Sequence, residues 1–110
     1  MELTNTPELL ELELLNENKE VIEIIDDDKE IEEIVKALSS KTRRSILQYI
    51  RDGPKDVSNI ASSLKMTEAN ISAQIKKLQD AQLISCDYSS GLHGVRKISK
   101  LKANQILIRF

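Results

Sequence analysis

Hydrophobic residues recur at the period of an α-helix in four successive stretches between residues 30 and 81. The first stretch, 30–38, has one apolar stripe at positions i, i+3, i+4 and i+7, formed by Ile31, Ile34, Val35 and Leu38. The second stretch begins after a serine N-cap, Ser39 or Ser40, and ends before Gly53-Pro54, which suits a helix C-terminus.

The third and fourth helical stretches lie close together in the sequence. Asp56 is the expected N-cap of a short helix that ends at Leu64, and Thr67 is the expected N-cap of the next helix. The turn Lys65-Met66 separates them. Two amphipathic helices joined by about three residues form a helix-turn-helix. We therefore place a helix-turn-helix at 57–81, and the inner face of its second helix is formed by Ile71, Ile75 and Leu78.

Residues 83–110 change from helical to strand-like periodicity. The run 83–88 is predicted to be a strand, and residues 89–91 are of types that favour a turn. Residues 94–101 contain a second predicted strand. A hairpin that follows a helix-turn-helix is a wing. The predicted fold class is therefore α+β, a winged helix-turn-helix of three to four helices plus a β-hairpin wing. Short N- and C-terminal strands complete it, the latter within 105–110.

The N-terminal segment has a different pattern. Leucine alternates with glutamate from Leu10 to Leu14, and isoleucines flank Glu23. Alternation at period two favours strands, and residues 16–19 can turn the chain between them. We favour an N-terminal strand or hairpin that packs near the C-terminal strand; a disordered acidic arm and a short helix are the alternatives. The expected division is an acidic arm at 1–28 and a winged-helix domain at 29–110.

Charge is divided unevenly along the chain. Residues 1–38 contain thirteen Asp and Glu against three Lys, a net charge of −10. Residues 39–110 contain five Asp and Glu against thirteen Lys and Arg, a net charge of +8. A basic segment of this kind suits a polyanionic partner. The alternative is that two oppositely charged surfaces only keep the protein in solution.

Composition excludes several classes of function. The single cysteine, Cys86, excludes an internal disulfide and a thiolate metal cluster within one chain. No catalytic constellation or phosphate-cradling glycine loop is present, so we expect no enzyme. No apolar run is long enough to span a bilayer and no signal-peptide pattern opens the sequence, so we expect no membrane association and a cytoplasmic location. His93 is expected to be an exposed loop residue.

Three segments carry a resemblance to a known family: VKALSSKTRRSILQYI (35–50), VSNIASSLKMTEANISAQIKKLQDAQLI (57–84) and GVRKIS (94–99). Together they resemble the ArsR-like winged-helix transcriptional regulators, particularly the archaeal members. The resemblance implies a sequence-selective regulator that binds double-stranded DNA, with helix 67–81 in the major groove and the wing, 85–99, on the backbone or in the minor groove. Because each half of a palindromic DNA site is bound by one of two identical DNA-binding domains, we expect a homodimer. The first helix and the terminal strands are the candidate dimer surfaces. No metal and no cofactor are expected, since the cysteine ligands of the metal-sensing members are missing.

The resemblance places the DNA-reading residues on the fourth helix and at its start: Thr67, Glu68, Ala69, Asn70, Ser72, Ala73, Gln74 and Lys77. Arginine is frequent where Ala73 stands, so this chain departs from the family pattern there. Asn70 and Gln74 are the best candidates for base readout, because an amide can form two hydrogen bonds with adenine. Glu68 suits the positive end of the helix dipole better than it suits a phosphate.

Basic side chains are the candidates for phosphate contacts. Lys76 and Lys77 on the fourth helix are expected to meet phosphates rather than bases. Arg96 and Lys97 lie in the wing, and an arginine there can enter a narrow minor groove. Further phosphate candidates near the start of the second helix are Arg43 and Arg44. The alternative for Arg96 and Lys97 is a solvent-facing strand, and the alternative for Asn70 and Gln74 is a solvated position on an exposed helix face.

Two further hypotheses concern the same surfaces. A winged helix can also be a protein–protein interaction adaptor without specific DNA readout. Ala73, where arginine is frequent in the family, leaves the DNA-facing side of the fourth helix with fewer groups that could contact bases. Alternatively, the acidic segment competes with DNA for the basic face and acts as an intramolecular brake.

Overall fold

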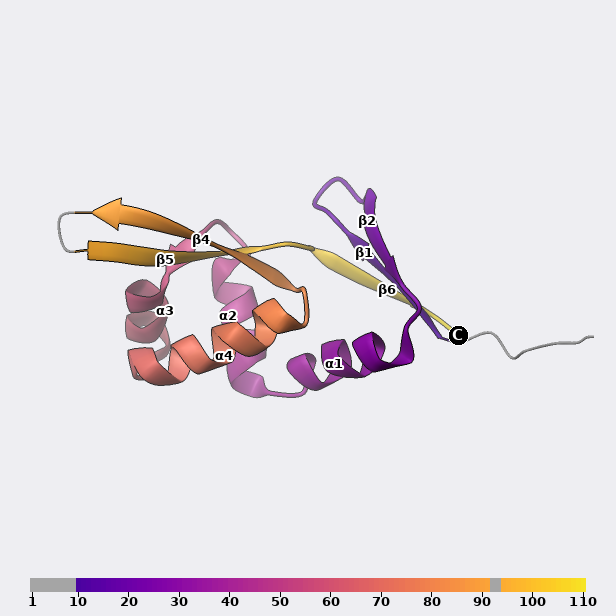
Figure 1. Cartoon of the computed structure of the whole chain (residues 1–110), viewed down its shortest axis with the longest axis horizontal. Coiled ribbons are helices and arrows are strands. Elements are labelled where there is room, and N and C mark those ends of the chain that lie inside the picture. Colours follow the sequence, from indigo (N-terminus) through magenta and orange to yellow (C-terminus); the bar gives the residue numbers. More distant parts are fainter. Residues whose placement is uncertain (1–9, 92–93) are drawn as a thin grey trace, which may run out of the picture.

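The computed structural model describes residues 10–91 and 94–110. Four helices occupy its centre, a long β-hairpin projects at one end, and a second small sheet lies at the other end (Figure 1). The chain is an α+β winged helix-turn-helix, as the sequence predicts. His93 lies outside the described residues.

The four helices are α1 (Asp28–Leu38), α2 (Lys41–Ile50), α3 (Val57–Leu64) and α4 (Glu68–Asp80). Each begins after a residue whose side chain accepts a hydrogen bond from the backbone N–H three positions later. The caps are Asp27, Ser40, Asp56 and Thr67, with donor–acceptor distances of 3.0, 3.3, 2.7 and 3.1 Å. The caps predicted for α2, α3 and α4 are therefore confirmed, and Ser40 rather than Ser39 caps α2.

The buried face of α1 does not include every residue of the predicted apolar stripe. Ile31, Ile34 and Ala37 are buried, whereas Val35 is 52% exposed. At about 100° per residue, Val35 lies roughly 100° around the helix from Ile34, the centre of the buried face. Ala37, a smaller residue, takes the packed position on the opposite flank, and Val35 remains on the surface.

The wing belongs to a three-stranded antiparallel sheet. It consists of β3 (Lys55–Asp56), β4 (Ile84–Gly91) and β5 (Gly94–Leu101), in the order β3-β5-β4. Pairing of β4 with β5 continues from Ile84 opposite Leu101 to Gly91 opposite Gly94, so residues 89–91 are strand and not turn. The two residues of β3 are too few to leave a periodic signal, and the sequence did not predict this strand.

A second antiparallel sheet, here called the terminal sheet, joins both ends of the described chain. It consists of β1 (Glu11–Leu15), β2 (Val21–Ile25) and β6 (Gln105–Arg109), in the order β2-β1-β6. The side-chain oxygen of Asn16 accepts hydrogen bonds from the N–H groups of Asn18 and Glu20 at 2.9 and 3.0 Å, and Lys19 has a φ of 63°. The N-terminal segment thus forms the hairpin that its alternation favours, and β1 pairs with the C-terminal strand. Whether residue 28 marks a domain boundary stays a prediction.

One hydrophobic core connects the terminal sheet to the helices. Leu12 and Leu14 of β1 and Ile25 of β2 belong to the same buried cluster as Ile34 of α1 and Ile46 of α2. Leu14 and Ile46 are completely buried. The terminal sheet is therefore packed into the same core as the helix-turn-helix.

Replacing Leu14 with alanine tests this shared core. We expect Leu14→Ala to lower the free energy of unfolding by about 2–5 kcal/mol, because it leaves a cavity at a completely buried position. The helical circular dichroism signal at 222 nm should be lost at a correspondingly lower urea concentration. Val95→Ala, at a position that is 70% exposed, is the control and should change the midpoint little. A helical signal unaffected by Leu14→Ala would mean that the terminal sheet unfolds independently.

Candidate nucleic-acid interface

The turn between α3 and α4 brings the two helices close together. Lys65 has φ 57° and ψ 47°, a left-handed conformation, and its N–H points to the carbonyls of Ala61 and Ser62. Met66 also donates its N–H to the Ala61 carbonyl at 2.9 Å. Ala61 is only 4% exposed, and its small side chain permits the close approach. The helix-turn-helix predicted at 57–81 is present.

Helix α4 has a buried face, two polar flanks and a small apolar patch at its most exposed positions. Ile71, Ile75 and Leu78 form the buried face. At about 100° per residue, Asn70 and Gln74 lie on one flank, and Glu68 and Ser72 lie on the other. The outermost positions of the N-terminal half are exposed alanines, Ala69 and Ala73.

The flank of α4 that contains Asn70 and Gln74, here called the amide flank, is connected by a series of hydrogen bonds. The backbone N–H of Asn70 donates to the hydroxyl of Thr67, and its side-chain nitrogen lies 3.7 Å from the sulfur of Met66. Gln74 Nε2 donates to Asn70 Oδ1 at 3.2 Å, and Gln74 Oε1 accepts from Arg43 Nη1 at 2.7 Å. Both polar atoms of Gln74 therefore have protein partners.

Arg43 and Arg44 bind the C-terminal carbonyls of α1. Arg43 donates from Nε to the Ala37 carbonyl at 2.8 Å and from Nη2 to the Lys36 carbonyl at 2.9 Å. Arg44 donates from Nη1 to the Leu38 carbonyl at 2.8 Å. These guanidinium groups satisfy helix-end acceptors and lie at the negative end of the α1 dipole. Both predicted phosphate contacts thus already have intramolecular partners, and their DNA role stays a prediction.

On the other flank, the wing is fastened to α3 by an ion pair. Arg96 Nε donates to Asp56 Oδ2 at 2.8 Å, and Arg96 Nη2 contacts the same oxygen. The Asp56 side chain is 10% exposed and that of Arg96 is 56% exposed. Beside this pair lies an open hollow of about 410 Å³, whose walls include Glu68 and Ser72 of α4 and Lys97 of β5.

The pKa of Asp56 is held below its ordinary value. The largest cause is the hydrogen bond from the backbone N–H of Asn59. Burial acts in the opposite direction, and the hydrogen bond and positive charge of Arg96 lower the pKa further. The carboxylate of Asp56 therefore serves both as the cap of α3 and as the anchor of the wing.

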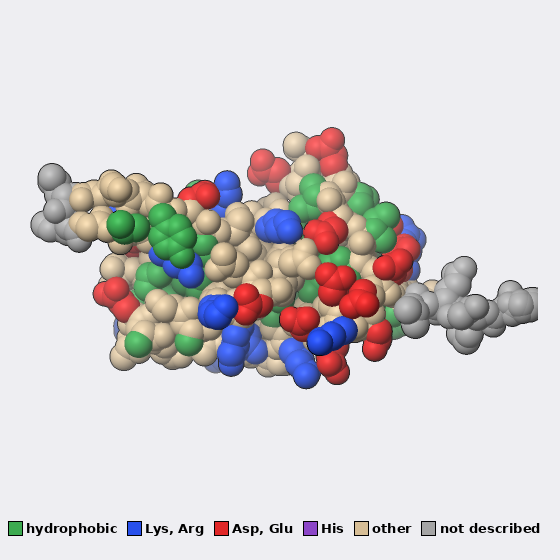
Figure 2. All heavy atoms as spheres, in the orientation of Figure 1, with side chains coloured by type: hydrophobic (Ala, Val, Ile, Leu, Met, Phe, Trp, Pro, Cys, Tyr) green, Lys and Arg blue, Asp and Glu red, His purple; other side chains and the backbone are tan. Residues whose placement is uncertain are grey.

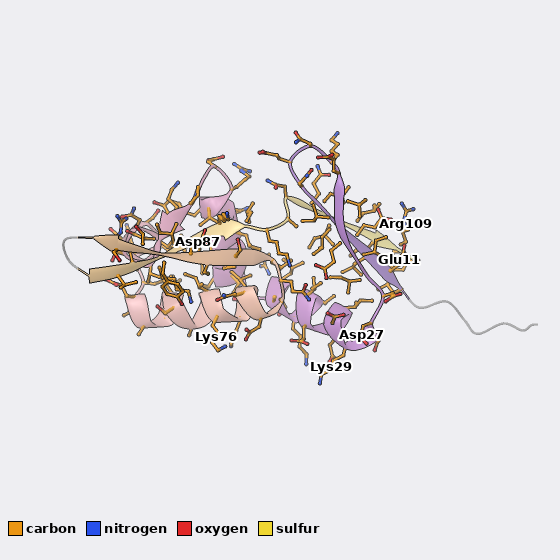
Figure 3. All side chains as sticks on the ribbon, turned by 45° about the horizontal axis from the view of Figure 1, so that its top comes forward. Glu11, Asp27, Lys29, Lys76, Asp87 and Arg109 are labelled. Atoms are coloured by element: carbon orange, nitrogen blue, oxygen red, sulfur yellow. The ribbon has the colours of Figure 1, made fainter. Side chains whose placement is uncertain are left out.

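Charged groups are distributed unevenly over the molecular surface. In Figure 2, acidic side chains gather over the terminal sheet and α1, and blue Lys and Arg side chains lie below the C-terminal part of α4 and, among acidic ones, below α1. Lys76 projects from α4 (Figure 3), and its Nζ lies 3.4 Å from Asp80. Acidic residues 11–25 lie in the terminal sheet, at the opposite end from the wing (Figure 1), and not over the basic face. For those residues the brake hypothesis is wrong.

Two further features of the described residues, 10–91 and 94–110, bear on function. No group of three or more His, Cys, Asp or Glu side chains among them is placed to hold a metal ion. None of their helices combines the length and apolar character needed to cross a membrane.

The structure brings together some of the expected site residues and separates others. Gln74 joins Arg43 across 31 residues of sequence, and Arg96 joins Asp56 across 40. Sequence reasoning missed both links, because no local pattern marks a contact between residues so far apart. Glu68 and Ser72 of α4 lie across one hollow from Arg96 and Lys97, and the binding role of all the expected site residues stays a prediction.

These features define a winged helix-turn-helix, and part of it is similar to a known family. Residues 40–85 match the family model described as bacterial regulatory protein, arsR family. The resemblance to ArsR-family regulators is thus confirmed over residues 40–85, which include α2 and the helix-turn-helix.

Several solved structures are similar to this chain. A homodimeric winged helix-turn-helix DNA-binding domain from Mycobacterium bovis, a possible ArsR-family transcriptional regulator, has a TM-score of 0.60 and 22% identity over 66% of this chain and 64% of that one. An ArsR family transcriptional regulator has a TM-score of 0.57 and 27% identity over 66% of this chain and 76% of that one. HlyU from Vibrio cholerae has a TM-score of 0.58 and 18% identity over 66% and 76% of the two chains.

The likenesses at 22% and 18% identity show the shared fold. The match to the Mycobacterium bovis domain spans slightly less than two-thirds of that chain. No curated protein sequence is significantly similar to this chain.

The ion pair between Asp56 and Arg96 makes stability dependent on pH. Because the folded-state pKa of Asp56 is lowered, its carboxylate stabilises the fold above about 3.9, the ordinary aspartate value, and this contribution is lost as pH falls through the folded-state pKa. We expect Asp56→Asn to lower the free energy of unfolding by about 1–2 kcal/mol at pH 7. The deficit should shrink below about pH 4.

Urea unfolding between pH 3 and pH 7 measures this difference. The control is Asp87→Asn, which removes an exposed carboxylate whose Oδ2 lies 3.7 Å from Lys100, and it should have little effect at any pH. A deficit of equal size at pH 3 and pH 7 would contradict a role for the charged form of Asp56.

Proposed function

We propose that this protein is a sequence-selective transcriptional regulator that binds double-stranded DNA as a homodimer in the cytoplasm. Helix α4 enters the major groove, and the wing contacts the backbone or the minor groove. The observation that carries the proposal is the convergence of the exposed face of α4 with Arg96 and Lys97 of the wing around one open hollow. The ArsR-type fold and the basic charge of residues 39–110 support it.

Lysines supply the sequence-independent part of the binding energy. Lys76 and Lys77 are exposed on α4, and Lys97 is half-buried beside the hollow. In the part of the chain that the structure describes, Lys77 and Lys97 make no ion pair, so they can approach phosphates without first releasing a carboxylate. Neutralising phosphates releases condensed counterions, which makes such binding strongly salt-dependent.

Base readout falls to the amide flank of α4. An adenine edge requires one donor and one acceptor from an amide, but both polar atoms of Gln74 have protein partners. On DNA, Gln74 therefore exchanges its bonds to Arg43 and Asn70 for bonds to the base. Arg43 keeps its two bonds to the α1 carbonyls, and the released Nη1 then contacts a phosphate.

Charge-neutralising variants test the phosphate contacts. We expect Lys77→Gln and Lys97→Gln each to weaken binding to every duplex by a similar factor, and to reduce the slope of log K against log salt by about 1. Fluorescence anisotropy with labelled duplexes at several salt concentrations measures both quantities. Lys29→Gln, on the acidic side of the molecule at α1 (Figure 3), is the matched control and should change neither. Salt-insensitive binding, or no binding to any genomic duplex, counts decisively against the proposal.

Replacement of Gln74 tests base readout. Gln74→Ala should reduce the discrimination between the preferred duplex and a mismatched one by about 1–3 kcal/mol, because it removes a bidentate contact. Arg43→Lys separates two explanations, since it removes the guanidinium that positions Gln74 but leaves the amide in place. Discrimination that survives Arg43→Lys and falls in Gln74→Ala supports a direct base contact. Equal loss in both variants would show that Gln74 acts only by positioning α4.

A second candidate function is that of a protein–protein interaction adaptor. The observation that favours it is the apolar character of the exposed wing, where Tyr88 is 69% exposed and Val95 is 70% exposed. These side chains suit a protein surface better than phosphates. A partner that binds the wing and is displaced by Tyr88→Ala, in a protein that binds no duplex, would favour the adaptor.

A further inference from the structure

The terminal sheet has an open edge. Its order is β2-β1-β6, so β6 is hydrogen-bonded to β1 on one side, and no strand of the described chain pairs with its other side. The side chains along this edge are apolar and accessible: Leu107 is 41% exposed and Ile108 is 44% exposed. An exposed apolar edge strand is a template for pairing with another chain.

Charge distinguishes the β6 edge from the other free edge of the sheet. The central residue of β2 is Glu23, whose carboxylate lies 3.4 Å from Nζ of Lys102. Two β2 strands paired about their centres would place Glu23 opposite Glu23, and like charges directly opposite are destabilising. The central residues of β6, 106–108, carry no charge, so β6 lacks the feature that protects an edge.

The sequence of β6 is self-complementary. In an antiparallel pair centred on Leu107, Ile106 lies opposite Ile108, and Gln105 lies opposite Arg109. Leu107 faces its own copy on the two-fold axis. Each apolar side chain meets an apolar one, and each arginine meets an amide that can accept its hydrogen bond. A two-fold pairing of this kind closes on itself and does not extend into fibres.

A hollow beside β6 offers room for a side chain of the second copy. It measures about 320 Å³, and its walls include Leu38, Leu47, Leu83, Leu101 and Ile106. Ile108 pairs with the buried Leu12 and so lies on the inner face of the terminal sheet. In the register centred on Leu107, Ile108 of the second copy lies opposite Ile106, which lines this hollow.

We propose that two copies of this chain associate through β6, antiparallel and centred on Leu107, to form one six-stranded sheet from two terminal sheets. The inference deepens the proposed function, on whose homodimer it rests, by assigning the dimer contact to the C-terminal strand. Helix α1, with Val35 exposed, is then outside the contact made by the strand edges.

A charge placed on the two-fold axis tests this contact. The mass of one chain is 12.5 kDa, and the parent should sediment with twice that mass. Leu107→Lys places two ammonium groups opposite each other and should raise the dimer dissociation constant by about tenfold or more. The matched control is Ile24→Lys, at an exposed apolar position on the other edge strand, which should leave the dimer intact. Helical circular dichroism identifies any variant that has failed to fold.

Cross-linking gives a second, independent measurement. In a Cys86→Ser background, Leu107→Cys should form a covalent dimer on mild oxidation, because directly opposed residues lie within disulfide range. Ile24→Cys should remain uncross-linked. A monomeric parent, or a dimer that resists Leu107→Lys and is not cross-linked through Cys at 107, would overturn the β6 contact.

DNA binding is measured separately on the same variants. A dimer disrupted by Leu107→Lys in a protein that binds no duplex supports the β6 contact and overturns the proposed function. A parent that binds DNA selectively but dimerises through another surface overturns only the β6 contact.

Discussion

The guanidinium group of Arg43 connects three helices, and the position of the reading helix depends on it. It donates to two carbonyls at the C-terminus of α1, and it donates to Gln74 of α4. Because Arg43 itself belongs to α2, one planar group fixes the end of α1 against both other helices. A lysine cannot replace it, since an ammonium group lacks the fixed fork geometry that reaches three acceptors in different directions.

The wing is held by a comparable contact on the opposite flank of α4. Asp56 caps α3 and binds Arg96 of β5, so the start of the helix-turn-helix and the wing share one carboxylate. The reading surface is therefore placed between two charge-assisted anchors, neither of which belongs to α4. The outermost positions of α4 itself, Ala69 and Ala73, contribute little polar chemistry. Under the proposed function, selectivity would therefore depend on the geometry of the flanks.

Sequence patterns predicted most of the fold because its elements have local causes. The four caps and the inner face of α4 follow from neighbouring residues, and the Asn16 turn follows from one side chain that binds its own backbone. The exposure of Val35 could not be predicted, because the flank of α1 that becomes buried depends on tertiary packing. The links from Gln74 to Arg43 and from Asp56 to Arg96 depend on tertiary packing, so the partners of the site residues could not be predicted.

Strands β5 and β6 are separated by only three residues, 102–104, and both ends of this connection are fixed. Lys102 donates its N–H to the Leu83 carbonyl at 3.0 Å, and Asn104 donates its N–H to the Leu15 carbonyl at 2.8 Å. The wing and the terminal sheet are thus two ends of one nearly continuous strand, as Figure 1 shows. In a dimer paired through β6, the separation of the two wings would be set by the length of this backbone and would have little freedom to adjust. Such a protein would distinguish binding sites by the spacing of their halves as well as by their bases.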